Sequence, residues 1–567
     1  MKVVIVGGVA GGASAAARAR RLSEDAEIVL FERGPNVSFA NCGLPYHIGG
    51  EIIKRDQLLV VSPERLRERF KLDVRVRSVV KAIDRASKSV RVVDLASGRE
   101  YTETYDRLIL APGASPVRPE VPGIDLPGIF TLRNLGDMDR IKERVDRGVD
   151  RAIMVGGGYI GLEMVENLKR RGIATTLIQS QDQVLASFDK EMTTPIAEHL
   201  AEHGVEVILN DSARLFARNR EGLEVRLRSG RRLLASLVVV GVGVKPENGL
   251  AVDAGLPVGP RGGIQVNDHL QTVDPDVYAV GDAIEVEDYV LGGPTQIPLA
   301  GPANRQGRIA ANHIFGDADA HYRGTQGTAI VGVFGKTAAM TGASEKVLKR
   351  LGRPHRKAYI HANNHAGYYP GARPITLKIL FDPTDGRILG AQAVGESGVD
   401  KRIDVLAMAI QAKMTVFDLE EAELAYAPQY GSAKDPVNMA GFVASGMLRG
   451  EHPQVDVEAI LEDLPKSLRF LLDVRTTDEF DDGHIPGAAN IPLDELRQRL
   501  GEIPRGPEVA AYCQVGQRGY LATRILLQEG FGAVNVGGGY QTYRLHRPEP
   551  FTTADRNQES SRSNAPA

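Results

Sequence analysis

The sequence of 567 residues has only two cysteines, Cys42 and Cys513, and no tryptophan. Because the cysteines are far apart in the chain, we do not expect a structural disulfide. We expect the protein to be located in a reducing cytoplasm. No apolar stretch is long enough to cross a bilayer, and the first residues read as a strand rather than a cleavable leader. The sequence therefore favours neither a disulfide-rich secreted protein nor a membrane protein.

The net charge argues against a protein that binds nucleic acids or membranes, and the positions of the histidines argue against a metal protein. The net charge is −3, which provides no basic surface for a nucleic acid or a membrane. The 12 histidines are scattered without metal-ligand spacing, so no bound metal is expected. Hydrophobic residues make up 43% and charged residues 25% of the chain, which is typical of a soluble globular protein with, at this length, three or four domains.

The N-terminal residues have the layout of a dinucleotide-binding unit. An apolar strand is followed by a glycine-rich turn at residues 7–12, a helix and a second strand that ends at Glu32. Such a turn places a phosphate at a helix N-terminus, and the acid about 20 residues further on binds a ribose hydroxyl. The middle glycine of the usual motif falls on Val9, and the neighbouring glycines compensate for it.

A second unit of this kind begins near residue 151. Residues 156–161 form a complete G-x-G-x-x-G turn, and the next strand ends at Gln179. An acid there would favour NADH and a nearby arginine NADPH, so the neutral Gln179 leaves that choice open. A later apolar strand ends at Gly281 and Asp282, where ligands of α/β sheets bind, although Asp282 could also be a helix cap.

Cys42 lies in a short polar stretch that could make it reactive. A cysteine reacts as its thiolate, which a helix N-terminus or a nearby positive charge stabilises. We expect Ser38 and Asn41 to cap the chain before Cys42, and Pro45 to prevent a helix from running through it. Gly43 would leave room for a thin substrate or a flat ring to reach the sulfur. The alternative is a buried cysteine that packs as a small hydrophobic residue.

Together these elements resemble the flavoprotein disulfide reductases with two dinucleotide-binding domains. The resemblance covers residues 1 to about 445 and includes an Ala-Pro-Gly sequence at 111–113 after a strand. In that family the first unit and the Gly-Asp strand hold FAD, and the inserted second unit holds the nicotinamide cofactor. The resemblance implies these cofactor-binding residues: Gly7, Gly8, Val9, Ala10, Gly11, Gly12, Glu32, Arg33, Ala111, Pro112, Gly113, Gly156, Gly158, Tyr159, Ile160, Gly161, Gln179, Gly281, Asp282, Pro298, Leu299 and Ala300.

The single cysteine near the first turn resembles the coenzyme A-disulfide reductase branch, since the glutathione reductase branch has a second cysteine five residues away. NADH oxidases and peroxidases of this branch carry a histidine at the position of Ala10, so oxygen or peroxide is not expected as the main substrate. The resemblance implies these substrate-binding residues: Ser14, Arg18, Arg21, Ser38, Asn41, Lys71, Asn304, Arg305 and Lys434. From the residues alone, Arg18 and Arg21 would be a solvated basic face of a helix.

The same resemblance gives Tyr368 and Tyr426 a catalytic role beside Cys42. In the family two such tyrosines come from the partner subunit and form hydrogen bonds near the sulfur, so a homodimer is expected. Without the resemblance, both would be interpreted as core aromatic residues with one polar end.

The C-terminal segment resembles a rhodanese domain. A strand ends at Cys513, and the six-residue loop from Cys513 to Arg518 leads into a helix. Such a loop surrounds the sulfur with backbone N–H groups, which stabilise a thiolate or a bound anion. Phosphatases with this fold have a loop one residue longer, so the shorter loop suits a persulfide, with Cys513 and Arg518 as catalytic residues. The alternative is a docking module without catalysis.

The predicted fold class is α/β, with two Rossmann-like dinucleotide-binding domains, an α+β dimerisation domain and a C-terminal rhodanese-like α/β domain. The predicted ranges are 1–110 (FAD, first part), 111–244 (NAD(P)H), 245–320 (FAD, second part), 321–445 (dimerisation), 446–465 (linker), 466–548 (rhodanese) and 549–567 (disordered tail).

The resemblance thus implies an FAD-dependent, NADH- or NADPH-driven reductase with one redox cysteine, fused to a sulfurtransferase domain. The expected substrates are coenzyme A disulfide, coenzyme A persulfide or polysulfide, and coenzyme A itself could be a bound thiol. The alternatives are an NADH oxidase with oxygen as acceptor, and a flavin-bound redox sensor whose rhodanese unit docks a partner.

Overall fold

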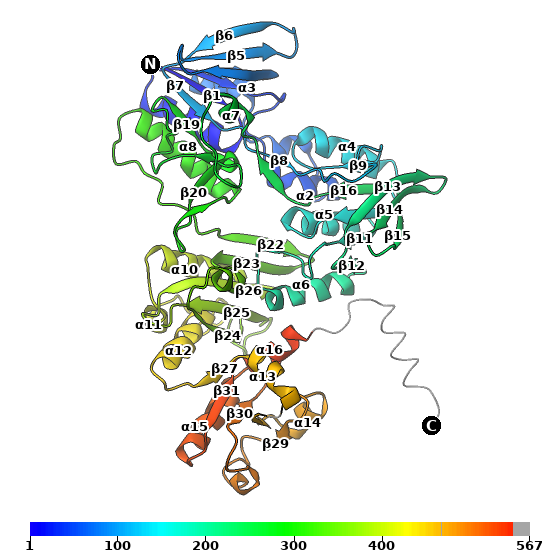
Figure 1. The fold of residues 1–567 in the computed structure, drawn as a ribbon, viewed down its shortest axis with the longest axis vertical. Coiled ribbons are helices and arrows are strands. Elements are labelled where there is room, and N and C mark those ends of the chain that lie inside the picture. Colours follow the sequence, from blue (N-terminus) through cyan, green and yellow to red (C-terminus); the bar gives the residue numbers. More distant parts are fainter. Residues whose placement is uncertain (467, 548–567) are drawn as a thin grey trace. The chain divides into compact units, whose positions relative to one another are not determined.

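The computed structural model describes residues 1–466 and 468–547 (Figure 1). The predicted tail, residues 549–567, lies outside the described residues. Among the helices of the described chain, none has the length and apolar character needed to span a membrane.

The chain divides into two compact units. The first unit comprises residues 1–180 and 211–327, and the second comprises residues 181–210 and the chain from residue 328 onward. Because each unit draws on two separate stretches of sequence, its sheets combine strands that are far apart in the chain. Cys42 belongs to the first unit and Cys513 to the second.

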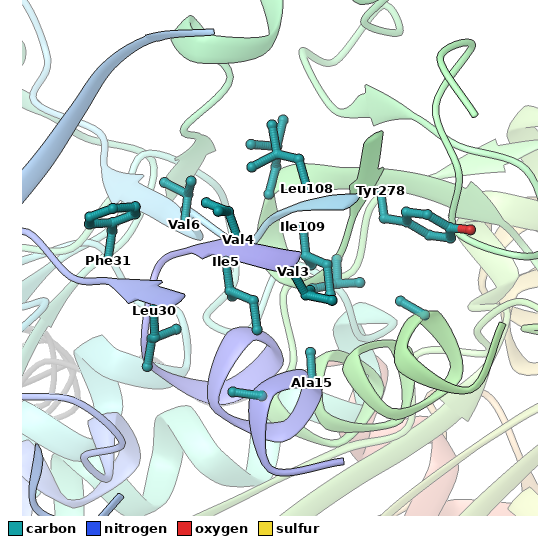
Figure 2. Packing of buried hydrophobic residues seen from close by; sticks show 14 of the residues in the cluster. Val3, Val4, Ile5, Val6, Ala15, Leu30, Phe31, Leu108, Ile109 and Tyr278 are labelled. Atoms are coloured by element: carbon teal, nitrogen blue, oxygen red, sulfur yellow. The ribbon is translucent and has the colours of Figure 1, made fainter. Parts of the chain in front are cut away.

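The first unit is organised around the strand β1 (Figure 2). It pairs in parallel with β2 on one side and with β7 on the other, in a sheet with the order β19-β7-β1-β2-β3. Ile5 and Leu30 point toward Ala15 of the helix α1, whereas Val4 points to the opposite face of the sheet. The strands and helix are β1 (Lys2–Val6), β2 (Glu27–Phe31), β3 (Asp73–Arg75), β7 (Arg107–Leu110), β19 (Val277–Ala279) and α1 (Ala10–Leu22).

The helix α8 (Ala300–Ile314) packs closely against α1 because glycines face each other where they cross. A Cβ atom on Gly307 would lie 2.1 Å from the carbonyl oxygen of Gly11. Only glycine permits that approach of two backbones. The contact holds α8 against the helix that starts at the first glycine turn.

A second parallel sheet in the first unit contains the neighbouring strands β11, β10, β16 and β9. The helix α5 follows β10, and α2 and α4 pack nearby. The antiparallel pair of β8 and β17 connects this part of the chain to the first sheet. The bounds are β8 (Ala114–Pro116), β9 (Ile129–Phe130), β10 (Arg151–Val155), β11 (Ala174–Ile178), β16 (Leu237–Val240), β17 (Val244–Pro246), α2 (Leu44–Gly49), α4 (Leu135–Asp146) and α5 (Tyr159–Arg170).

The second unit contains an antiparallel sheet with the order β22-β23-β26-β25-β24. All eight residues of β26 are buried, as expected for a central strand with helices on its face. The bounds are β22 (Ala329–Val333), β23 (Lys336–Gly342), β24 (Arg356–Asn363), β25 (Pro374–Phe381), β26 (Ile388–Gly395), α6 (Lys190–Glu202), α9 (Glu345–Arg350), α10 (Val399–Gln411), α11 (Val416–Glu421) and α12 (Pro436–Leu448).

The C-terminal part of the second unit is a parallel sheet with the order β27-β31-β30-β28-β29. The bounds are β27 (Gln454–Val455), β28 (Phe470–Asp473), β29 (Ala489–Asn490), β30 (Val509–Tyr512), β31 (Ala533–Val536), α13 (Val457–Asp463), α14 (Thr477–Asp481), α15 (Gln517–Gln528) and α16 (Gly539–His546).

The range predicted as a linker, residues 446–465, contains regular structure. It includes the end of α12, the strand β27 and the helix α13. Val457 and Ile460 are buried against Tyr512, so this stretch is part of a hydrophobic core. Pro453 and the polar residues around it led to the linker interpretation, but they occupy only the short turn before β27.

Candidate active sites

The first glycine turn joins β1 to α1 and is closed by backbone contacts. Gly7 has φ +101°, and a Cβ atom there would lie 2.0 Å from the carbonyl oxygen of Ala111. A Cβ atom on Gly12 would lie 1.9 Å from the oxygen of Gly7. The N-cap residue of α1 is Val9, which supplies no side-chain cap, and the first turn contains no acid. The N–H groups at this helix end therefore suit a phosphate.

Glu32 lies just after β2 and faces the same turn. Its carboxylate accepts hydrogen bonds from the N–H groups of Gly8, at 2.9 Å, and Gly34, at 2.8 Å. This is the position in which a carboxylate binds the ribose of a dinucleotide. Burial raises the pKa of Asp282, which follows Gly281 at the end of β19. The close-packed turn, the acid and the Gly-Asp strand together fit FAD.

The other residues predicted to bind FAD lie at neighbouring strand ends or helix starts. Arg33 and Arg133 both pair with the carboxylate of Glu247, at 3.3 Å and 3.0 Å. Although burial opposes it, hydrogen bonding from Ser115 and Arg133 lowers the pKa of Glu247 to about 2. The remaining positions are Ala10 and Gly11 at the start of α1, Ala111, Pro112 and Gly113 after β7, and Pro298, Leu299 and Ala300 at the start of α8.

The second glycine turn repeats this geometry between β10 and α5. A Cβ atom on Gly156 would lie 2.3 Å from Gly241 O, and one on Gly161 would lie 2.0 Å from Gly156 O. Gly158 is the N-cap of α5, and Tyr159, Ile160 and Gly161 form its first turn. Gln179 accepts a hydrogen bond from the N–H of Gly157 at 3.0 Å, as Glu32 does from Gly8, but without a charge.

Cys42 is exposed and lies in a short 3₁₀ turn, Asn41–Gly43, directly before α2. Pro45 lies in the first turn of α2, so the helix begins after the cysteine as predicted. The capping prediction for Ser38 and Asn41 is wrong, because no side chain caps either turn. Gly43 is also explained differently: a Cβ atom there would lie 2.4 Å from Cδ2 of the buried Leu58, so a side chain at this position would force Leu58 to move.

Ser38 instead shapes the backbone before the cysteine. It has φ +47°, a left-handed conformation that costs a residue with a side chain about 1 kcal/mol or more. Its N–H donates to Gly8 O at 2.8 Å, and its carbonyl accepts from Val60 N at 2.9 Å. These bonds tie the segment that carries Cys42 to the first glycine turn.

Two residues that the sequence pattern does not single out, Tyr46 and Glu163, lie near Cys42. Tyr46 donates a hydrogen bond to Glu163 Oε1 at 3.3 Å, and burial raises the pKa of Glu163 to about 7. Although Cys42 is accessible, the surrounding protein removes part of the water around its sulfur, and this desolvation, followed by the carboxylates of Glu163 and Asp282, raises the pKa of Cys42. The only available signal was an acidic residue among buried apolar residues on the helix after the second glycine turn.

The predicted substrate residues of the first unit fall into two groups. Ser14 donates to Asn304 Oδ1 at 2.5 Å, and Arg18 donates to Asn312 Oδ1 at 2.6 Å, which places them together on one face of α1 and α8. Arg21, Arg305 and Lys71 are exposed, and Lys71 pairs with Glu24 at 2.9 Å. The buried Arg20 binds backbone carbonyls only, so its role is structural.

Tyr368 and Tyr426 are brought together in the second unit. Their hydroxyl groups are 2.8 Å apart, and their side chains are 76% and 49% exposed. The alternative interpretation as core residues is therefore wrong. Lys434 is also exposed, directly before the buried Asp435 that pairs with Arg402 at 2.6 Å.

Cys513 lies at the end of β30, and its loop leads into α15. The thiol is buried and accepts a hydrogen bond from the N–H of Gly516 at 3.2 Å. Gly516 has φ +97° at the N-cap of α15. A Cβ atom on Gly539 would lie 2.2 Å from the carbonyl oxygen of Cys513, so the start of α16 closes the other side of the loop.

Arg518 ends this loop and forms a two-bond ion pair with Glu479, at 2.7 Å and 2.6 Å. Hydrogen bonding from Arg518 is the largest cause that lowers the pKa of Glu479 to about 2. The pKa of Arg518 is raised mainly by Glu479 and to a smaller extent by Cys513. The positive charge at the loop is thus largely balanced.

Three buried carboxylates, those of Asp189, Glu191 and Glu345, converge in the second unit. The ammonium of Lys378 lies among them, at 2.9 Å, 2.6 Å and 2.5 Å. Lys378 therefore supplies the cation that such a cluster needs, and the group is a buried ion-pair network.

Comparison with known proteins gives a consistent result. The pyridine nucleotide-disulphide oxidoreductase family matches residues 1–307, its dimerisation domain matches residues 328–435, and the rhodanese-like domain matches residues 455–546. A coenzyme A disulfide reductase of Staphylococcus aureus is 37% identical over 444 residues, which cover 78% of this chain and 99% of the relative.

Solved structures cover more of the chain. Reduced CoADR-RHD of Bacillus anthracis is 48% identical, with a TM-score of 0.94, and covers 96% of this chain and 98% of its own. An NAD-dependent persulfide reductase from A. fulgidus is 36% identical, with a TM-score of 0.89 and coverage of 96% and 100%. A water-forming NADH oxidase from Lactobacillus brevis is 27% identical, with a TM-score of 0.77 and coverage of 79% and 99%.

These matches confirm the predicted fold class and the predicted pair of cofactors. The chain belongs to the pyridine nucleotide-disulphide oxidoreductase family, as an FAD- and NAD(P)H-dependent reductase with a dimerisation domain and a C-terminal rhodanese-like domain.

Proposed function

We propose that the first unit reduces coenzyme A disulfide or coenzyme A persulfide at Cys42, and that Cys513 carries sulfane sulfur. The observation that carries this proposal is a single exposed cysteine tied to the first glycine turn, in a unit without a second one. One redox cysteine must form its disulfide with an external thiol. The activities in the names of the S. aureus and A. fulgidus relatives support this substrate class.

The chemistry at Cys42 is thiol–disulfide exchange. The Cys42 thiolate attacks one sulfur of a disulfide, a new S–S bond forms, and the other half leaves as a thiolate. With a persulfide, attack on the outer sulfur leaves that sulfur on Cys42 and releases the thiol. Two electrons then cleave the new S–S bond, which restores the Cys42 thiolate and releases the second thiolate from the mixed disulfide or hydrosulfide from the persulfide. FAD, when bound, supplies these electrons from NADH or NADPH.

The residues around Cys42 support these steps through charge and proton placement. Glu163, with a pKa near neutrality, and Tyr46 form a proton-bearing pair close to the thiol. Ser14, Arg18 and Asn304 form a polar and basic face on α1 and α8. Such a face suits the phosphates of coenzyme A.

The exposed hydroxyl pair of Tyr368 and Tyr426 fits a homodimer in which each subunit completes its partner's site. The matching dimerisation domain supports such a dimer. Two free cysteines and no disulfide fit a cytoplasmic enzyme.

In the rhodanese-like domain, the ion pair with Glu479 leaves Arg518 little positive charge for the sulfonate group of a donor such as thiosulfate, so the loop favours a donor whose transferred sulfur is not attached to an oxyanion. A small sulfur on Cys513 requires only the N–H groups of the loop. We therefore assign persulfides or polysulfide as the sulfur source of this domain.

An oxidase that uses oxygen is the second candidate, because the L. brevis oxidase shares the fold of the reductase part. The experiment is anaerobic oxidation of NADH and of NADPH by the holoenzyme with coenzyme A disulfide or coenzyme A persulfide, beside oxygen uptake with NADH alone. The proposal expects fast anaerobic turnover with at least one sulfur substrate and slow oxygen uptake. Oxygen uptake faster than turnover with both sulfur substrates would favour the oxidase.

A further inference from the structure

His452 lies in the segment between α12 and β27, far in sequence from the loop of Cys513. The N–H groups of His452 and Glu451 both donate to the carbonyl oxygen of Gly446, at 3.1 Å and 2.9 Å, which fixes this segment to the end of α12. The His452 side chain is only 7% exposed and packs on the ring of Tyr520 in α15, with ring centroids 4.2 Å apart.

Asn535 connects His452 to the sulfur loop. Its amide nitrogen lies 2.9 Å from His452 Nε2 and 3.1 Å from the carbonyl oxygen of Gly516. An amide NH₂ group has two hydrogens, so it can donate one to each partner. The reverse amide orientation would place two acceptor oxygens against each other, which fixes the orientation of Asn535 and makes His452 Nε2 an acceptor.

Gly516 is the residue through which this contact reaches the sulfur. Its N–H donates to Cys513 Sγ at 3.2 Å, and its carbonyl is held by Asn535. Gly516 has φ +97°, in the left-handed region. Glycine is free to adopt other conformations, so contacts with its neighbours have to fix its backbone. Its peptide groups therefore link the buried Asn535 to the sulfur of Cys513.

We propose that His452 is a positioning residue of the sulfurtransfer site, which holds Gly516 through Asn535 so that the N–H of Gly516 points at the sulfur of Cys513. This inference rests on the proposed role of Cys513 as a sulfur carrier. In that reaction the Cys513 thiolate attacks the outer sulfur of a persulfide or polysulfide, the S–S bond breaks, and the remaining sulfur leaves as a thiolate. A fixed N–H donor stabilises the negative charge on Cys513 before attack.

The surroundings of His452 keep its ring neutral, as an acceptor must be. Burial, and then the nearby Arg524, lower the pKa of His452 to about 4. The Gln454 amide nitrogen lies 3.1 Å from Nε2 and 3.4 Å from Nδ1, so a second potential donor stands beside the ring. Asn535 itself is only 1% exposed. Its side-chain oxygen has no hydrogen-bond partner among the described residues, so the two bonds from its NH₂ group fix the side chain.

The test compares His452→Phe with His452→Gln in the full-length holoenzyme. Phenylalanine keeps a ring against Tyr520 but accepts no hydrogen bond, whereas the glutamine oxygen can accept the same Asn535 N–H. Thiocyanate formation from inorganic polysulfide and cyanide gives kcat and KM. The pH profile of Cys513 alkylation by iodoacetamide, followed by mass spectrometry of the Cys513 peptide, reports the thiolate directly.

The proposal expects His452→Phe to lower kcat by about tenfold, the equivalent of one buried hydrogen bond, with KM unchanged. Its alkylation profile should shift to higher pH, while coenzyme A disulfide reduction at Cys42 stays the same. His452→Gln should remain within about twofold of wild type. A wild-type kcat and alkylation profile in His452→Phe, or equal impairment in both variants, overturns the proposal.

Two further results separate this inference from the function on which it rests. If wild type forms neither thiocyanate nor a sulfur adduct on Cys513, the sulfur-carrier function fails, and the alkylation profiles still decide whether His452 positions the loop. If His452→Phe does not fold, as judged by near-UV circular dichroism, Asn535→Ser replaces it. Serine has one donor and cannot bridge both partners, so the same loss of kcat and the same alkylation shift are expected.

Discussion

At the scale of the residue, the environment of Cys42 differs from what its sequence neighbours indicate. The polar residues before it do not cap a helix end. Partial desolvation by the surrounding protein raises the pKa of the thiol, and the carboxylates of Glu163 and Asp282 raise it further. A resting thiol that is hard to ionise reacts slowly with stray oxidants. Reactivity then depends on what removes or neutralises these charges.

Glu163→Gln should make Cys42 easier to ionise, because it removes a negative charge next to the thiol. The pKa of Glu163 is about 7, so its charge is mostly present above pH 7 and mostly absent below. The midpoint of Cys42 alkylation by iodoacetamide should move to lower pH, and the rate at pH 8 should rise by up to about tenfold.

The matched control is Glu166→Gln on the same helix, since Glu166 pairs with Arg170 at 2.8 Å. Glu166 acts on the thiol only through Glu163, so this variant should shift the alkylation profile much less than Glu163→Gln does. The account of Cys42 is wrong if Glu163→Gln leaves the profile as in wild type, or if both variants shift it equally.

We expect the residue type at position 179 to set the choice between NADH and NADPH. It accepts from the second glycine turn as Glu32 does from the first, but it neither attracts a 2′-hydroxyl nor repels a 2′-phosphate by charge. We expect wild type to use both NADH and NADPH. Gln179→Glu should raise the ratio of kcat/KM for NADH over NADPH by at least about tenfold, through repulsion of the phosphate.

Gln179→Leu, which removes the polar group without adding charge, should leave that ratio within about threefold of wild type. Steady-state kinetics with saturating sulfur substrate measures both variants. An unchanged ratio in Gln179→Glu would show that the ribose is bound elsewhere.

At the scale of the element, the crossing of α1 and α8 positions the first glycine turn, where the structure fits FAD. It places the turn at the start of α1 beside the start of α8, and it depends on the absence of a side chain at Gly307. Gly307→Ala should force the two helices apart, at a cost of about 1–3 kcal/mol. The variant should lose FAD at lower denaturant concentration and have a lower melting temperature.

Gly301→Ala is the control on the same helix, because the nearest atom to its added Cβ is Arg305 Nη1 at 3.9 Å. Flavin fluorescence during thermal unfolding measures both variants. Equal stability of the two would mean that the α1–α8 crossing is not what retains the flavin.

The sequence predicted elements well where a turn has a distinctive chemistry. Both glycine turns, the end of the strand at Asp282 and the loop of Cys513 lie between the elements that their patterns indicate. It failed at residues 446–465, because Pro453 and polar residues hid two short apolar elements that are buried only in the tertiary structure. Glu163 and His452 were missed for a related reason, since each acts on a loop that is distant in sequence.

At the scale of the whole molecule, the proposed homodimer predicts shared active sites. If Cys42 of one subunit works with Tyr368 and Tyr426 of its partner, a Cys42→Ser subunit can complement a subunit with both tyrosines changed to phenylalanine. Co-expression should restore about a quarter of wild-type activity, because half of the dimers are mixed and each has one complete site.

Each variant expressed alone is the control and should have much lower activity. Differently tagged subunits allow the mixed dimers to be purified, and light scattering gives their mass. The shared site is contradicted if purified mixed dimers are no more active than the two parents.

The two cysteines lie in different units, so the central claim is that Cys42 alone reduces small sulfur substrates. The most direct measurement is anaerobic NAD(P)H oxidation with coenzyme A disulfide by wild type, Cys42→Ser and Cys513→Ser, each with FAD bound. We predict that Cys42→Ser still accepts electrons from NAD(P)H into FAD but loses turnover by a factor of about 10³ or more, and that Cys513→Ser stays within about twofold of wild type. Near-normal turnover in Cys42→Ser would contradict the account.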